Sequence, residues 1–116
     1  MDKISLRIPN QAIYLSPLRL LVSGLLTSHK VDIETMEDVK IAVTECCNIA
    51  LELNCEEYID IDFIFVDDDL YIEISAFDEK IIKEREDLSL AGTIIECLVD
   101  SCVLEGKKLC LEKNLK

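Results

Sequence analysis

The sequence predicts an α+β domain, a two-layer α/β sandwich in which helices cover one face of a mostly antiparallel sheet. Three observations favour this class. Several segments alternate apolar and polar residues with the period of a strand, three others repeat apolar residues at helical spacing, and two of the strand-like segments are joined by a short polar turn. The predicted order is β-α-α-β-β-α-β, in a single domain that spans residues 1–116.

The first strand and helix are predicted within residues 3–28. Residues 3–8 alternate Ile or Leu with polar residues, and Pro9 ends the strand. Asn10 is a suitable cap for a helix from Gln11 to about Ser28, and His29 follows where the helix dipole favours a positive charge. The apolar residues at helical spacing are Ile13, Leu18, Leu21, Val22 and Leu25.

A second helix is predicted between Asp32, a good N-cap, and Asn54, a plausible end. Its apolar residues step by three and four along one face, which predicts that Val39, Val43 and Ala50 are buried.

Two strands follow, at residues 58–66 and 70–76, and form an antiparallel hairpin. The three aspartates at 67–69 between them lack the alternating ligands, glycine and distant glutamate of a calcium loop, so we expect a solvated turn.

The last part of the chain predicts one helix and one strand. A charged connection at residues 80–87 precedes a helical pattern at residues 91–104, which Gly106 ends. Leu109 and Leu111 alternate with polar residues in a short final strand.

Composition limits the function. With 24 acidic and 12 basic residues the formal charge is −12, which disfavours nucleic-acid binding and, more weakly, nucleotide binding. No apolar stretch of about 18 residues and no signal peptide is found, so we expect a soluble cytoplasmic protein. The six cysteines form no C-x-x-C pair, and the sole histidine, His29, is distant from them in sequence. We therefore expect free, reduced thiols, of which Cys46, Cys47, Cys97 and Cys102 pack as small hydrophobic residues in the predicted helices.

The first half of the chain resembles the RsbW-like serine-kinase anti-sigma factors of the histidine-kinase-like (GHKL) ATPase superfamily. The resemblance lies in Ile8-Pro9-Asn10, Leu18-Arg19-Leu20, Ser23-Gly24 and the segment from Glu37 to Asn48. It implies the Bergerat ATPase fold, whose element order agrees with the predicted one.

The family's second helix carries a glutamate that acts as a base and, one turn later, an asparagine that helps hold Mg²⁺ at the phosphates of ATP. Glu45 matches the glutamate, whereas the next turn holds Ile49. Asn48 lies one step early, about 100° around the helix.

Two further motifs of the family bind adenine and phosphate. Asp78 matches the adenine-binding aspartate if the register shifts by one residue, but no glycine follows it. The phosphate loop keeps only Gly92, and the lid is shortened to a charged run around residues 84–87. We therefore expect a degenerate ATP site. The cleft between the second helix and the sheet is either open or filled by Ile49, Phe77 and Leu90, and the sequence leaves both alternatives open.

The resemblance implies a regulatory protein that binds a sigma factor, an anti-anti-sigma (STAS) protein, or both, and Arg19 matches the family's partner-contacting arginine. The alternative is an active protein-serine kinase that uses ATP and Mg²⁺, with Glu45 as the base, Asn48 at the metal and Asp78 at adenine.

A homodimer is also expected, because the resemblance implies pairing through the sheet edge and the first helix. That helix has leucine or valine in nearly all directions, and Leu20 is predicted to lie at the two-fold axis. The alternative is a monomer whose apolar patch binds a protein partner.

Overall fold

The computed structural model describes all of residues 1–116 and confirms the predicted α+β sandwich. The strands are β1 (Asp2–Pro9), β2 (Tyr58–Val66), β3 (Asp69–Ser75), β4 (Ser101–Glu105) and β5 (Lys108–Asn114). The helices are α1 (Leu15–Ser28), α2 (Ile33–Leu53), α3 (Glu79–Glu84) and α4 (Ser89–Leu98), with single 3-10 turns at Ala12–Tyr14 and Glu86–Leu88. None of the helices combines the length and apolar character needed to span a membrane.

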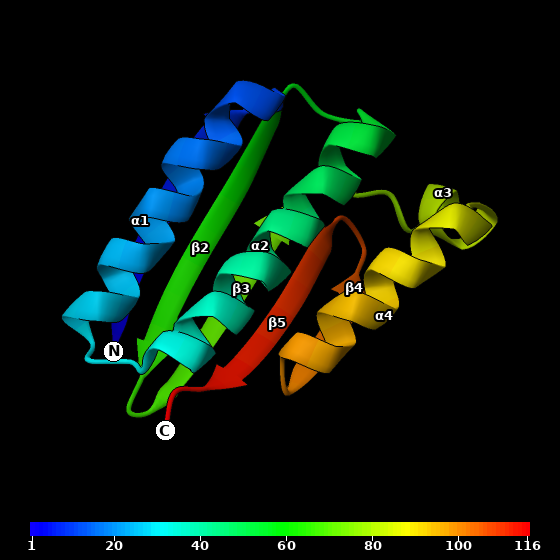
Figure 1. Cartoon of the computed structure of the whole chain (residues 1–116). Helices are drawn as coiled ribbons and strands as arrows, with labels where there is room; N and C mark the ends of the chain where they lie inside the picture. The colour runs from blue at the N-terminus through cyan, green and yellow to red at the C-terminus, as the bar shows by residue number, and fades with distance from the viewer.

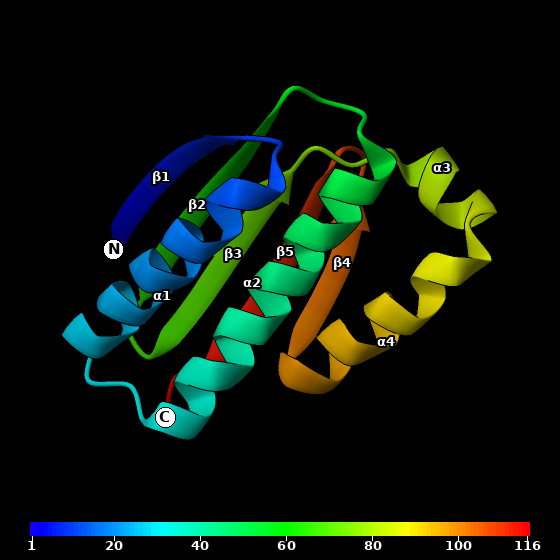
Figure 2. The same ribbon diagram turned by 45° about the horizontal axis from the view of Figure 1, so that its top comes forward.

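The five strands form one antiparallel sheet in the order β1-β2-β3-β5-β4. All the helices lie on the same side of it, with α2 between α1 and α4 (Figures 1 and 2). β1 and β4 are therefore the edge strands, and the opposite face of the sheet carries no helix.

α2 is the central helix, and its ends are capped as predicted. The Asp32 carboxylate accepts a hydrogen bond from the Thr35 amide at 2.7 Å, and Asn54 adopts the left-handed conformation, with φ +48°, that ends the helix. The predicted buried face is confirmed, because Val39, Val43 and Ala50 are each at most 1% exposed.

The predicted hairpin of β2 and β3 forms the middle of the sheet. Phe63 is opposite Ile72 and Ile61 is opposite Ile74, and all four side chains are buried under the helices. Asp67 has φ +53° in the connecting turn, which aspartate tolerates better than most residues do. The period-two pattern of these strands therefore fixed which face is buried.

α1 packs through a narrower stripe than the sequence indicates. Leu18, Val22 and Leu26 are buried, and Leu21 and Leu25 are partly buried. The placement of Ile13 in this stripe was wrong, because Ile13 lies in the 3-10 turn before α1 and is 70% exposed. At the other end, His29 stacks on Phe65 with ring centroids 3.8 Å apart.

The helix predicted at residues 91–104 is wrong in its last third. α4 ends at Leu98, Val99 is extended, and Cys102 and Val103 belong to strand β4. Gly106, with φ +61°, lies in the turn between β4 and β5 rather than at a helix end. The structure thus adds β4 and the short helix α3 to the predicted elements.

The six cysteines are unpaired, as expected. Cys46 and Cys47 are buried in α2, and burial raises the pKa of the Cys47 thiol to about 12. The expectation that Cys97 packs as a core residue was wrong, because it lies on the exposed side of α4. Only the first two cysteines behave as the small hydrophobic residues described above.

Val43→Asp should lower the free energy of unfolding by more than about 3 kcal/mol, because it places an unpaired carboxylate in the core. Ile41→Asp on the same helix is the matched control, since Ile41 is 44% exposed, and should cost much less. Chemical denaturation of the two variants measures the difference. Equal stability of Val43→Asp and the unmodified protein would show that the buried face of α2 is misassigned.

Candidate functional site

α2 presents the predicted site residues to two different surfaces. Glu45 and Arg19 line the same shallow groove between α1 and α2, with a volume of about 300 Å³. Ile49, one turn after Glu45, is buried and lines a cavity shared with α4. Asn48 is exposed. Glu45 thus lines a groove together with Arg19, and neither of them lines the α2–α4 cavity.

Arg19 reaches across the α1–α2 groove to α2. Its Nε donates a hydrogen bond to the Thr44 hydroxyl oxygen at 3.2 Å, and that hydroxyl donates to the carbonyl oxygen of Lys40 at 2.7 Å. Lys40 forms its own ion pair with Glu37 at 3.1 Å. Arg19 has a neutral partner only, so its positive charge is not balanced by a carboxylate within the chain.

The α2–α4 cavity is small and apolar. It has a volume of about 210 Å³, and seven of its nine lining residues are apolar. α2 contributes Ile49, α3 contributes Ile82, α4 contributes Ile95 and the sheet contributes Leu104 and Leu109. Drug-sized ligands occupy pockets of about 300–1,000 Å³, so this cavity suits a smaller apolar group.

The three residues named as able to fill this region differ in exposure. Phe77 and Ile49 are buried. Leu90 does not fill the cleft, because it is 69% exposed, and Leu88 is the leucine that lines the cavity. Leu88 precedes the first turn of α4 and faces inward, whereas Leu90 lies on the outer side of that helix.

Asp78 and Gly92, the two residues expected to bind nucleotide beside this cleft, lie at α3 and α4. Asp78 is the N-cap of α3, where one carboxylate oxygen accepts hydrogen bonds from the amides of Lys80 at 2.9 Å and Ile81 at 3.3 Å. Gly92 lies within α4 and lines the cavity, and a Cβ added to it meets no atom within 4 Å. The space in front of Gly92 is open.

A wider outer groove of about 680 Å³ continues from the cavity. The two share Ile82, Leu88, Gly92 and Glu96. The basic residues of the outer groove are engaged in ion pairs. Arg85 pairs with Asp87 at 2.6 Å and with Glu52 at 3.8 Å, and Lys83 pairs with Glu79 at 3.0 Å.

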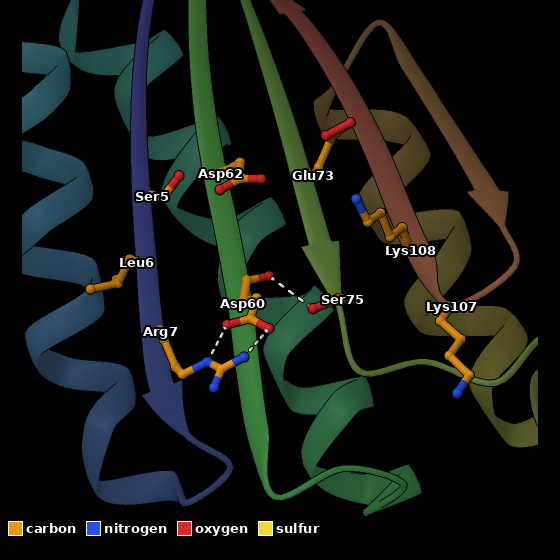
Figure 3. Close-up of a pocket in the computed structure, with 9 residues that line it drawn as sticks. All are labelled: Ser5, Leu6, Arg7, Asp60, Asp62, Glu73, Ser75, Lys107 and Lys108. Atoms are coloured by element: carbon orange, nitrogen blue, oxygen red, sulfur yellow. Dashed lines mark hydrogen bonds and ion pairs between the residues drawn. The ribbon is translucent and has the colours of Figure 1, made fainter.

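The uncovered face of the sheet holds a third polar site that the sequence did not single out. Figure 3 shows Arg7 of β1 facing Asp60 of β2, with bonds of 2.7 and 3.1 Å from the guanidinium to the two carboxylate oxygens. The guanidinium also lies 5.2 Å from the ring centre of Tyr58. Hydrogen bonding from Arg7 lowers the pKa of Asp60, and the carboxylate raises the pKa of Arg7.

This polar face extends over β1, β2, β3 and β5 in a broad depression of about 630 Å³, which includes Asp62, Glu73 and Lys108. The signal for it was present in the sequence as the polar half of each alternating strand. The pairing of Arg7 with Asp60 depends on the register of β1 against β2, which periodicity alone does not specify.

Comparisons with known proteins support the fold. No protein-family model matches the chain, and no curated protein does. Among solved structures, the crystal structure of the RsbU and RsbW domains of Rv1364c from Mycobacterium tuberculosis matches over 100% of this chain, with a TM-score of 0.76 and 10% identity. This chain spans 32% of the length of that one. The match supports the α+β fold.

Asp60 should make stability depend on pH. Because its pKa is lower in the folded than in the unfolded state, its ionisation stabilises the fold above about pH 3.9, and this stabilisation is lost as the pH falls through the folded-state value. Asp60→Asn should therefore lose less stability than the unmodified protein between about pH 5 and pH 2. The effect should be small, because the pair is exposed to solvent.

Asp2→Asn, on the same strand pair but without an ion-pair partner, is the control for that measurement. Denaturant midpoints across the pH range would measure both variants. The same acid sensitivity in Asp60→Asn as in the unmodified protein would refute the role of the Arg7–Asp60 pair.

Proposed function

We propose that this chain is a regulatory domain of the anti-sigma-factor type that acts by binding protein partners, and that its ATP site is degenerate. The fold supports the class, because a solved structure that matches over the whole of this chain contains an RsbW domain. The observation that carries the proposal is the apolar α2–α4 cavity, which lies where the family resemblance requires a nucleotide.

The residues around this cavity do not fit ATP with Mg²⁺. Magnesium is held by oxygen ligands, and Ile49 supplies none from the helix position that faces the cavity. Asn48, which has a suitable oxygen, is exposed. Glu45, the candidate base, lines the α1–α2 groove instead. The kinase alternative requires an oxygen ligand for Mg²⁺ one turn after Glu45, and the apolar Ile49 at that position disfavours it.

The charges near the cavity also disfavour a triphosphate. Lys83 and Arg85 are already paired with carboxylates, and Glu86 and Glu96 line the outer groove with no ion-pair partner. A polyanion in this groove would face uncompensated negative charge. This supports a role without nucleotide chemistry.

Partner binding would use the α1–α2 groove. Arg19 carries a positive charge without a carboxylate partner in the chain, at the rim of a groove about 300 Å³ in volume. An acidic side chain of a sigma factor or a STAS-type protein would complete a charge-assisted hydrogen bond there. The unpaired thiols suit a reducing compartment, so we place this partner switching in the cytoplasm.

Self-association would use α1 and the edge strand β1, which lie on the same side of the molecule (Figure 2). Leu20 is 73% exposed on α1, and β1 pairs with β2 on one side only. A two-fold axis beside Leu20 would cover this residue in both copies.

Leu20→Glu should convert the proposed dimer to a monomer, because it places two like charges at the axis. Sedimentation at micromolar concentration should give twice the 13.2 kDa chain mass for the unmodified protein and the single mass for the variant. Ile33→Glu is the matched control, since Ile33 is 77% exposed at the start of α2 and should leave the mass unchanged. A stable mass near 13.2 kDa in the unmodified protein would rule out the dimer and leave Leu20 as a surface for another protein.

Titration of a non-hydrolysable ATP analogue with Mg²⁺, followed by calorimetry, tests the degenerate site. We expect no binding heat at millimolar nucleotide, because the cleft offers no metal ligand at Ile49 and few free cations. Micromolar affinity that is lost in Glu45→Gln or Asp78→Asn would overturn the proposal and support the protein-serine kinase.

A further inference from the structure

The α2–α4 cavity has the properties of a ligand site of its own. Its walls are mostly apolar, and it opens into the outer groove through shared lining residues. An apolar cavity of about 150 Å³ is enough to hold a benzene molecule. The 210 Å³ available here therefore accommodates an apolar group somewhat larger than benzene.

The unpaired charges at the opening of the cavity are negative. Glu96 lines both the cavity and the outer groove, Glu86 lines the outer groove, and neither forms an ion pair. The two cations of the groove, Lys83 and Arg85, are neutralised by their own carboxylate partners. The free charges that a ligand meets at the opening are therefore carboxylates.

Glu96 also acts on the interior of the cavity. Cys102 lines the cavity floor on β4, and burial together with the nearby Glu96 carboxylate raises the pKa of its thiol. Because Glu96 lines both the cavity and the outer groove, the polar end of a ligand whose apolar body fills the cavity would lie near this carboxylate.

We propose that the α2–α4 cavity binds a small amphiphile with an apolar body of about six to eight carbon atoms and a protonated amine. The apolar body packs between Ile49 and Ile95, and the ammonium group lies at Glu96. This inference rests on the proposed function in one respect, because it requires that the cleft does not hold ATP. Carboxylate-bearing amphiphiles of the same size are disfavoured by the same charges.

Phenethylamine is the direct probe, compared with phenethyl alcohol and phenylacetate, which have similar apolar bodies and a neutral or negative end. In protein labelled at isoleucine methyl groups, the signals of Ile49, Ile82 and Ile95 should shift, and that of Ile61 under α2 should not. We expect the amine to bind about two- to five-fold more tightly than the alcohol, the range for an exposed ion pair. Phenylacetate should bind most weakly.

Two pairs of variants separate the cavity from the charge. Gly92→Leu fills the open space in front of the helix and should abolish the shifts, whereas Gly24→Leu, at an equally open position of α1, should not. Glu96→Gln should remove the preference for amine over alcohol while both still bind. Glu84→Gln makes the same charge change on α3 outside the cavity lining and should keep the preference.

The outcomes distinguish this inference from the proposed function. If none of the three cavity methyl signals moves at saturating phenethylamine, or if the amine preference survives in Glu96→Gln, the inference is overturned. If MgATP added to the same sample shifts these signals, the degenerate ATP site is overturned as well. Silence from both ligands removes the amine site and leaves the proposed function standing.

Discussion

Burial of one face of α2 against the β2–β3 hairpin is the interaction on which the rest of the structure depends. Val39, Val43 and Ala50 are fully buried above Phe63 and other apolar residues of the central strands. Because burial of this face fixes the rotation of α2 about its own axis, it also decides which side chains point toward the neighbouring helices. Thr44 and Glu45 line the groove beside α1, and Ile49 lines the cavity beside α4. The two candidate surfaces are thus consequences of a single packing constraint.

The sequence was sufficient to predict an element where the signals for that element are local. β1, α2 and the hairpin follow from periodicity and capping residues, and α2 begins and ends at the residues that its caps predict. The end of α4 was not predictable in this way, because no glycine or proline separates Leu98 from β4. The amine of Lys113, on β5, donates to the Leu98 carbonyl oxygen at 2.8 Å, and Asp100 accepts a hydrogen bond from the Asn114 amide at 2.6 Å. The interactions at the end of α4 therefore come from β5 and not from residues next to Leu98 in the sequence.

The candidate site was predictable to a similar degree. Helical phase alone indicated that Ile49, and not Asn48, occupies the position one turn after Glu45, and the structure places the two side chains on different sides of α2. The cavity depends on where α4 lies, and so on the same tertiary contacts that end that helix. The pairing of Arg7 with Asp60 depends on strand register. Sequence patterns name the residues on a face, whereas tertiary packing decides which faces meet.

The strand order has a consequence for folding. β4 joins the sheet only through β5, which inserts between β3 and β4. Until β5 has paired, β3 lacks its second neighbour and β4 has no neighbour in the sheet. Docking of the β4–β5 hairpin therefore protects the edge of β3, which would otherwise be an open template for pairing with another chain.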